Sequence, residues 1–188
     1  MSWFDAREWL ERLNRWLPDQ WIELGGAGRA PQLALPSESQ WEVACRANSD
    51  MPFHWGDSLD GSWANVDATY TYGEGRNGAF RQRPTPIGGF GLVNRWGLAE
   101  MHGQLFEWCG DRWHPDPLGA GWPEDGLAWE EADPALEGLQ DQDYRLLRGG
   151  SWLSTPWGCR SAFRNCGIPD SRYSDNGFRV CCLPPGPS

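Results

Sequence analysis

The chain of 188 residues is long enough for one domain, residues 1–188, with a single substantial core. Its formal net charge of −10 and its isoelectric point near 4.7 argue against nucleic-acid binding, which needs a basic patch, and against docking on an anionic membrane. Because no apolar run approaches the ~18 residues of a spanning helix and the N-terminus lacks the pattern of a secretory signal, we expect a protein that is cytoplasmic as synthesised, without membrane insertion.

Residues 2–17 are predicted to form an amphipathic helix. Ser2 can cap it together with Asp5 three residues later, and Pro18 is expected to end it. Its apolar positions recur at helical spacing, which indicates a face that packs on a sheet. These positions are Ala6, Trp9, Leu10, Leu13, Trp16 and Leu17.

A short strand and a second helix follow. Residues 33–35 are apolar and suit a small strand. Ser37 and Gln40 form a capping box at the start of the helix, which is expected to stop near residues 47–48. Both helices have the structural role of packing against a sheet, and neither carries a catalytic motif.

Residues 52–95 are predicted to be irregular. The chain contains 24 Gly, 15 Pro and 14 Trp, a composition typical of a loop-rich domain held together by aromatic side chains. In this stretch Asn65, Asp67 and the carbonyls between them are oxygen ligands of the kind that calcium prefers, so a structural calcium ion is one interpretation. The interpretation we favour is that these side chains form Asx-turns with their own backbone. We expect no other cofactor.

A predicted strand over residues 105–109 carries one carboxylate, Glu107, which needs a partner or a metal if it is buried. His102 is a candidate ligand or base, but a histidine without a second candidate nearby is more often structural, and we favour that role. Residues 114–143 are acidic and rich in Pro and Gly, which indicates a solvated loop. Residues 144–147 form the strand that leads into the C-terminal segment.

The C-terminal segment, residues 148–180, mixes two kinds of position. A frame of rigid-looking motifs, such as Arg148–Trp152 and Gly177–Val180, alternates with short runs that follow neither a period of 2 nor one of 3.6. Burial therefore does not explain the irregular runs. Either they form an irregular surface, or something other than folding determines their identities.

Five linked motifs, in this order, resemble the formylglycine-generating-enzyme (sulfatase-modifying factor) domain. They are Leu35–Glu42, Trp55–Asp57, Ala64–Asp67, Trp96–Trp108 and Arg148–Ser151. The resemblance implies an α+β fold, a variant of the C-type lectin fold with two helices packed on small sheets and long irregular loops. One departure is that the family's N-terminal strands do not precede the first helix here, so we expect a smaller sheet or one completed by other means.

The resemblance first implies an enzyme. Formylglycine-generating oxygenases hold copper with two thiols near the Gly-Gly-Ser motif. The second thiol matches Cys159, whereas the first falls on Ser154, whose hydroxyl is a poor ligand for soft Cu(I). Related sulfoxide synthases use a histidine-rich iron site, but this chain has only His54, His102 and His114. We therefore expect no enzymatic activity; a formylglycine-generating-type oxidoreductase and a catalytically silent scaffold are the alternatives.

The C-terminal motifs also resemble the variable proteins of diversity-generating retroelements, in which a reverse transcriptase copies a template and randomises only its adenines. An AAC codon changed at its adenines yields the NNC set of residues. The irregular runs largely belong to that set; Trp157 instead follows from an AGG codon, and Phe163 is one adenine change from the Tyr of the pattern. The resemblance thus implies hypervariable residues displayed on a C-type lectin scaffold, without catalysis.

The variable positions are the predicted ligand-binding residues, and we expect them to line one exposed face. Trp157, Phe163 and Tyr173 would act as aromatic anchors, with Ser and Gly as adaptable contacts. The expected partner is an unknown protein or a surface glycan, met after display on a phage or cell surface. The predicted residues are Leu153, Ser154, Thr155, Trp157, Gly158, Phe163, Cys166, Gly167, Ile168, Ser171, Tyr173, Ser174, Asp175 and Asn176.

Overall fold

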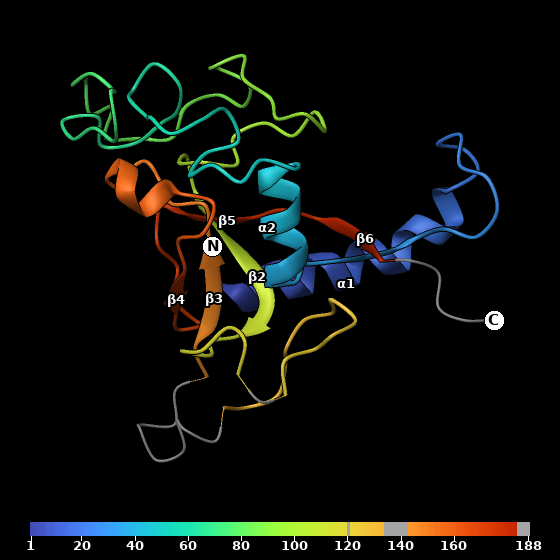
Figure 1. The fold of residues 1–188 in the computed structure, drawn as a ribbon. Helices are drawn as coiled ribbons and strands as arrows, with labels where there is room; N and C mark the ends of the chain where they lie inside the picture. Colours follow the sequence, from blue (N-terminus) through green and yellow to red (C-terminus); the bar gives the residue numbers. More distant parts are fainter. Residues whose placement is uncertain (120, 134–142, 184–188) are drawn as a thin grey trace.

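The computed structural model describes residues 1–119, 121–133 and 143–183, which form two α-helices and two small sheets (Figure 1). In chain order the elements are α1 (Trp3–Gln20), β1 (Gln32–Ala34), α2 (Glu38–Arg46), β2 (Phe106–Arg112), β3 (Arg145–Arg148), the 3₁₀ helix η2 (Pro156–Cys159), β4 (Asn165–Gly167), β5 (Asn176–Phe178) and β6 (Cys181–Leu183). The expected α+β class is confirmed. The three strands predicted from the sequence are present as β1, β2 and β3, with slightly shifted ends.

Helix α1 begins as predicted but runs further. Ser2 Oγ accepts a hydrogen bond from Asp5 N at 3.1 Å, and Asp5 Oδ2 accepts one from Ser2 N at 2.9 Å, which completes the capping box. The expectation that Pro18 ends the helix is wrong, because the helix continues to Gln20. A proline removes the hydrogen bond of its own missing N–H, and in the last turn of a helix that loss does not stop the next two residues.

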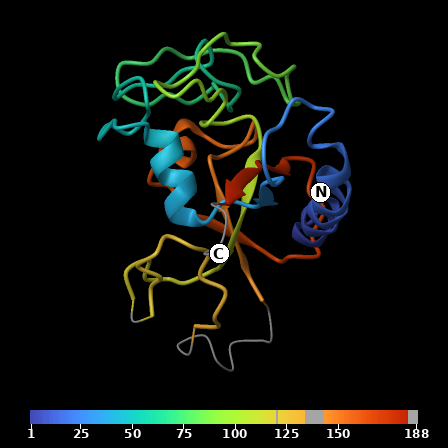
Figure 2. The ribbon, with the colours of Figure 1, turned by 90° about the vertical axis from the view of Figure 1, so that its right-hand side faces the viewer.

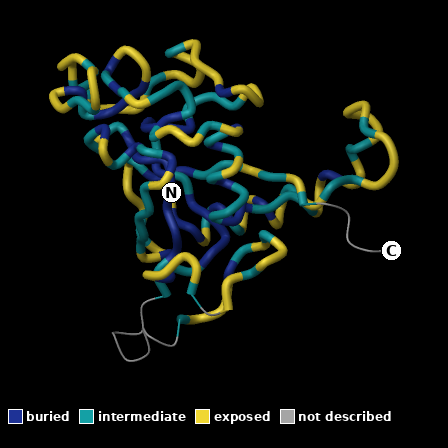
Figure 3. Tube along the Cα trace, viewed as in Figure 1, coloured by how far each residue is buried: buried dark blue, intermediate teal, exposed yellow. Residues whose placement is uncertain are grey.

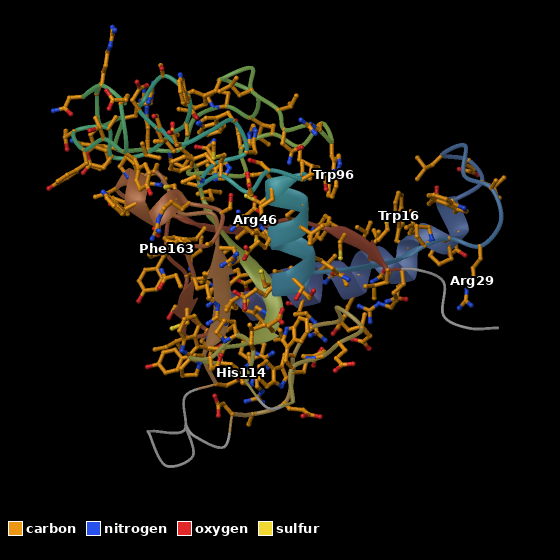
Figure 4. The ribbon with its side chains drawn as sticks, viewed as in Figure 1. Trp16, Arg29, Arg46, Trp96, His114 and Phe163 are labelled. Atoms are coloured by element: carbon orange, nitrogen blue, oxygen red, sulfur yellow. The ribbon has the colours of Figure 1, made fainter. Side chains whose placement is uncertain are left out.

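The apolar face of α1 is only partly covered. Ala6 and Leu10 are buried, whereas Trp9 and Trp16 are 47% and 51% exposed. Trp16 lies on the part of α1 that extends away from the strands (Figure 4). The packing surface is therefore narrower than the apolar stripe in the sequence. In the described part of the chain, neither helix combines the length and apolarity needed to cross a membrane.

Helix α2 has the predicted boundaries. Ser37 Oγ accepts a hydrogen bond from Gln40 N at 3.1 Å, and Gln40 Oε1 accepts one from Ser37 N at 3.0 Å. At the other end Ala47 adopts the left-handed conformation, with φ of 44°, and its N–H still bonds to the Val43 carbonyl. This geometry ends the helix where the apolar pattern stops.

The larger sheet has the strand order β4-β3-β2-β5. Strand β2 pairs antiparallel with β3 and parallel with β5, and β3 pairs antiparallel with β4, so the sheet is mixed. Its two edge strands, β4 and β5, both come from the C-terminal segment. The smaller sheet joins β1 to β6 in antiparallel orientation.

Alternate side chains of β2 and β3 pack against helices on opposite faces of the larger sheet. Trp108 and Leu147 belong to a core cluster with residues of α1, whereas Cys109 and Leu146 belong to a cluster with Trp41 of α2. Figure 2 shows the strands between the two helices. Buried residues are concentrated in these strands, and most of the outer loops are exposed (Figure 3).

The side chain of Asn14 closes the outer edge of β1. Its Nδ2 donates to the Leu33 carbonyl at 2.7 Å, and its Oδ1 accepts from the Leu33 N–H at 2.8 Å. Both backbone groups therefore face α1, while Leu33 lies opposite Cys182 of β6 in the register of the smaller sheet. A helix side chain thus takes the place of a neighbouring strand.

Residues 52–95 lack regular structure, as predicted. Isolated bridges join Phe53 to Gly56 and Leu59 to Tyr72. Phe53, Leu59 and Val66 are fully buried in a third core cluster that holds this stretch in place. In Figure 1 these loops lie above η2 and the upper end of α2. Buried aromatic and aliphatic side chains therefore replace the missing backbone ladders.

Candidate binding face of the C-terminal segment

Four residues in the frame of the C-terminal segment are fully buried. Arg148, Ser151, Cys159 and Ser161 each have a relative exposure of 0%. Gly150 has a φ of 75°, and a Cβ there would lie 2.4 Å from the sulfur of Cys159, so both the backbone angle and the space require glycine. The second glycine of the Arg-Gly-Gly-Ser motif is therefore required by the fold of this chain.

Arg148 anchors the segment to α2. Its guanidinium pairs with Glu42 and, at 3.3 Å, with Glu38. It also donates to the carbonyls of Phe163 at 2.9 Å and Ser161 at 2.7 Å. Arg148 precedes η2, whereas Ser161 and Phe163 follow it. The buried guanidinium therefore connects the backbone before η2 to the backbone after it.

The first group of predicted binding residues lies on the turn after the frame motif and on η2. Leu153 and Trp157 are 49% and 57% exposed. A Cβ at position 158 would have its nearest neighbour at 3.5 Å, so this position accepts a side chain. The half-buried members of the group are Ser154, Thr155 and Gly158.

The second group consists of Phe163 and residues in and after β4. Phe163 is half-buried against the α1-side core and lies on the left-hand side of Figure 4. Ile168 is 38% exposed, and Cys166 is half-buried. Gly167 departs from the expectation of a freely variable surface position. A Cβ there would lie 2.8 Å from the ring of the buried Trp108, so any larger residue requires the core to move.

The third group precedes and enters β5. Tyr173 is 59% exposed, Ser174 is exposed and Ser171 is half-buried. Asn176 requires a correction, because it lies inside β5 opposite Phe106 and is only 7% exposed. Its side chain belongs to the sheet rather than to an exposed face. The pattern of NNC residues could not reveal this, because it carries no information about strand pairing.

Ser151 brings the first and third groups together. Its hydroxyl donates to Asp175 Oδ2 at 2.9 Å, and its backbone N–H donates to Ser154 Oγ at 3.0 Å. Asp175 itself is half-buried, and its carbonyl accepts the N–H of Phe106 at 2.8 Å. The two groups are thus adjacent around one buried frame residue, and Figure 1 shows η2 and β4 on the same side of the molecule.

His102 has the structural role that we favoured. It is 2% exposed, with Nδ1 at 2.7 Å from the Cys159 carbonyl and Nε2 accepting the N–H of His54 at 3.1 Å. These partners require the neutral tautomer with the proton on Nδ1. Burial lowers the pKa of His102 to about 3, so the ring stays neutral and joins η2 to the loop that carries His54.

The two positions that correspond to a copper-binding thiol pair have other partners. The Cys159 thiol donates to the Thr155 carbonyl at 3.6 Å, and burial raises its pKa to about 12. Since a thiolate is the form that binds metals and attacks substrates, this environment favours an inert thiol. The Ser154 hydroxyl is held by Ser151, as described above.

Glu107 is half-buried and has protein partners. Arg179 donates to it through Nε at 3.0 Å and through a terminal nitrogen at 2.8 Å, and Trp41 Nε1 donates at 2.7 Å. This bidentate pair ties β2 to the chain just after β5 and to α2.

The candidate calcium ligands are divided between two environments. Asp67 Oδ1 accepts from Thr69 N at 3.1 Å and from the Thr69 hydroxyl at 2.6 Å, which is the Asx-turn that we favoured. The Asx-turn expected for Asn65 is wrong, because its Nδ2 donates to the distant Gln104 side chain and its buried Oδ1 has no hydrogen-bond partner. Within residues 1–119, 121–133 and 143–183, no group of three or more His, Cys, Asp or Glu is arranged to hold a metal.

Sequence reasoning missed the residues that support Trp157. Tyr72, from the irregular stretch, contacts the Trp157 ring, and the Arg160 guanidinium lies over that ring at 5.4 Å. Two closely spaced tyrosines, Tyr70 and Tyr72, in an otherwise small and polar run were the available signal. Without the fold, nothing connected that run to the C-terminal segment.

Comparison with known proteins gives a consistent family assignment. A model of the sulfatase-modifying factor enzyme 1-like domain matches residues 1–182. The formylglycine-generating enzyme of Thermomonospora curvata is 31% identical over 162 residues, which are 80% of this chain and 49% of that protein. The hercynine oxygenase of Mycolicibacterium smegmatis is 31% identical over 154 residues, 78% of this chain and 32% of that protein. The inactive C-alpha-formylglycine-generating enzyme 2 of Bos taurus is 26% identical over 162 residues, 81% of this chain and 46% of that protein.

The chain therefore spans half or less of the length of these curated relatives, which include proteins named as enzymes and one named as inactive. Among solved structures, PvdO from Pseudomonas aeruginosa has a TM-score of 0.66 at 28% identity, covering 92% of this chain and 58% of that one. Treponema denticola variable protein 1 has a TM-score of 0.57 at 26% identity, covering 82% and 49%. These neighbours confirm the C-type lectin fold of the formylglycine-generating-enzyme type.

Proposed function

Because the chain belongs to the sulfatase-modifying factor enzyme 1-like domain family, we propose that it is a non-catalytic member that binds a ligand, as the variable protein of a diversity-generating retroelement. In this proposal the C-terminal segment displays hypervariable residues on a fixed C-type lectin scaffold. The similarity to Treponema denticola variable protein 1 supports it.

One observation carries the proposal: fully buried residues of the frame alternate along the segment with exposed large side chains of the irregular runs. The frame residues Arg148, Ser151, Cys159 and Ser161 are fully buried. In contrast, four large hydrophobic residues at predicted variable positions are exposed, namely Leu153 at 49%, Trp157 at 57%, Ile168 at 38% and Tyr173 at 59%. Exposed aromatic and aliphatic side chains on a buried frame are typical of a binding surface and are not needed for folding.

Two predicted positions are better excluded from the variable set. Gly167 is confined by Trp108, and Asn176 is buried in β5. The proposed binding face is therefore centred on residues 153–158 and 171–175, with Phe163, Cys166 and Ile168 at its side. This division makes the proposal more specific than the codon pattern alone.

The DNA that flanks the gene tests the retroelement assignment. We expect a near-copy of the coding sequence for the C-terminal segment that differs at adenines, close to a gene for a reverse transcriptase. The codons for Gly167 and Asn176 should match between the two copies, whereas those for Leu153 and Trp157 should differ. A flanking sequence without such a copy would favour the catalytically silent scaffold.

The enzyme alternative makes a different prediction. A formylglycine-generating oxidoreductase would consume oxygen in the presence of copper and a thiol-containing peptide, and Cys159→Ser would abolish this consumption. We expect no copper-dependent consumption above that of the Cys159→Ser variant, because Ser154 stands where the first thiol of the pair is required. A rate that depends on Cys159 would overturn the non-catalytic assignment.

A further inference from the structure

The exposed Trp157 is supported by a residue outside the variable segment. Its ring meets the ring of Tyr72 at a centroid distance of 4.5 Å and an angle of 60°. Tyr72 is half-buried, so part of its ring lies at the surface beside the indole. The aromatic surface that a ligand meets at η2 therefore comes from two segments of the chain.

Contacts within the protein hold both the backbone and the ring of Tyr72 in place. It exchanges two backbone hydrogen bonds with Leu59, at 3.0 Å and 3.1 Å. Its ring packs edge to face on Phe53 at 5.3 Å, and Phe53 is fully buried. Since the backbone and one side of the ring are fixed before any ligand arrives, contact with Tyr72 costs little conformational entropy.

The loop that carries Tyr72 and the turn that carries the variable residues are joined. The N–H of Asp67 donates to the Ser154 carbonyl at 2.9 Å. On the other side of Trp157, Arg160 Nε donates to the Trp157 carbonyl at 2.9 Å. Both contacts involve backbone carbonyls of variable positions, so they survive a change of side chain at those positions.

We propose that Tyr72 is a fixed contact residue of the binding face, which together with position 157 receives an apolar side chain of a protein ligand. This inference rests on the proposed function. Trp, Tyr and Arg dominate the binding energy of protein interfaces, and Trp157, Tyr72 and Arg160 meet here. Whatever residue stands at position 157, the ligand would thus contact it next to the same tyrosine.

The polar groups around this surface favour a protein over a glycan. A glycan needs outward-facing donors and acceptors beside the aromatic ring, but three polar side chains here already have partners within the protein. Asp67 bonds to Thr69, and Ser154 and Asp175 bond to Ser151. These three side chains therefore add few free donors or acceptors beside the Trp157 and Tyr72 rings.

A selection experiment with two defined targets tests the proposal. Positions 153, 154, 155, 157, 158, 163, 171, 173, 174 and 175 are randomised in the full chain with NNC codons, with TGG added at 157. The library is displayed on ribosomes under reducing conditions, because all six cysteines are free. It is selected in parallel on hen egg-white lysozyme and on yeast mannan. Tyr72→Leu, Tyr72→Phe and Tyr70→Leu are then introduced into the binders.

We expect lysozyme binders in which Tyr72→Leu weakens the affinity by about tenfold or more, while Tyr72→Phe and Tyr70→Leu change it by less than about threefold. Leucine retains apolar contact with Phe53, and thermal unfolding of each variant confirms that it is folded. Lysozyme binders that tolerate Tyr72→Leu would overturn the role of Tyr72, and binders to mannan alone would overturn the protein ligand. A library that yields binders to neither target would contradict the proposed function itself.

Discussion

Arg148 shows how one buried residue supports the surface around it. Its guanidinium, 0% exposed, pairs with two glutamates of α2 and with two carbonyls of the C-terminal segment. A buried charge of this kind is stabilising only while its partners are present. The main role of Arg148 is therefore to donate several hydrogen bonds at once, which hold the C-terminal segment against α2.

Replacing Arg148 with Met should lower the free energy of unfolding by about 3–5 kcal/mol, because two carbonyls lose their donor and two carboxylates each lose one of two arginine partners. Urea denaturation monitored by tryptophan fluorescence measures this loss. The control is Arg12→Met, which removes an exposed pair with Glu8 and should cost less than about 0.5 kcal/mol. A loss below about 1 kcal/mol for Arg148→Met would show that the pair is not a main anchor.

His102 should make the fold sensitive to acid. Its pKa falls from 6.5 to about 3 in the folded protein, so the unfolded chain binds a proton below pH 6.5 that the folded chain does not. Stability from this group is thus present above pH 6.5 and is lost as the pH falls. Between pH 7 and pH 5 the expected loss is about 2 kcal/mol.

The variant His102→Gln isolates this effect. Glutamine can donate to the Cys159 carbonyl and accept from the His54 N–H, but it does not titrate. The difference in unfolding free energy between wild type and variant should shrink by about 2 kcal/mol from pH 7 to pH 5. Subtraction removes the contribution of Asp111, whose pKa burial raises to about 6 and which acts with the opposite sign. A difference that does not change with pH would contradict the neutral buried histidine.

At the scale of elements, the smaller sheet depends on a helix side chain. Asn14 satisfies both backbone groups of Leu33, so β1 has neighbours on both sides although its sheet has only two strands. Two-stranded sheets are marginally stable in isolation. Helix α1, which extends beyond the larger sheet, is in turn fastened to β1 by the same two bonds.

Asn14→Ala should therefore destabilise the protein by about 1–2 kcal/mol, because two backbone groups lose their partner in a partly buried place. Hydrogen exchange of the Leu33 amide gives the local measurement, and it should become faster in the variant. Glu8→Ala, on the exposed side of the same helix, is the matched control and should leave that amide unchanged. Equal protection in both variants would show that β1 does not need the clamp.

The two glycines of the predicted variable set, Gly158 in η2 and Gly167 in β4, differ in the space around them. Gly167→Ala places a methyl group 2.8 Å from Trp108 and should cost about 1–3 kcal/mol. Gly158→Ala finds its nearest neighbour at 3.5 Å and should change the free energy of unfolding by less than about 0.5 kcal/mol. Thermal unfolding of the two variants compares them directly. Similar losses would remove the structural distinction between the positions.

Local signals in the sequence were enough for the helices and the first strands. The capping residues Ser2 and Ser37 placed both helix starts, because a cap is a contact between residues three apart. Strands β4, β5 and β6 were not predicted, since each has three residues and forms only when a distant strand pairs with it. The burial of Asn176 and the contact of Tyr72 with Trp157 have the same origin. Both depend on neighbours more than 60 residues away in the chain.

For the whole molecule, the full burial of Arg148, Ser151, Cys159 and Ser161, together with the exposure of large side chains at predicted variable positions, predicts that the surface can change without loss of the fold. Simultaneous replacement of Leu153, Trp157, Ile168 and Tyr173 by Ser removes four large exposed side chains. The expected loss of unfolding free energy is about 2 kcal/mol or less, because surface substitutions are individually small. Chemical denaturation measures it, and a loss as large as that of Arg148→Met would place these residues in the core.

The hydroxyl of Ser151 adds a property that a static frame would lack. It accepts the N–H of Leu153 at 3.2 Å while donating to Asp175, and Ser154 Oγ lies 3.3 Å away as a second partner. A hydroxyl has one donor and two acceptor sites, and its hydrogen rotates freely. If residue 154 or 175 is replaced, that hydrogen can turn toward whichever acceptor is then present. Ser151 thus works as a hydrogen-bond adaptor, and a single rotatable proton lets an unchanging backbone tolerate changing neighbours.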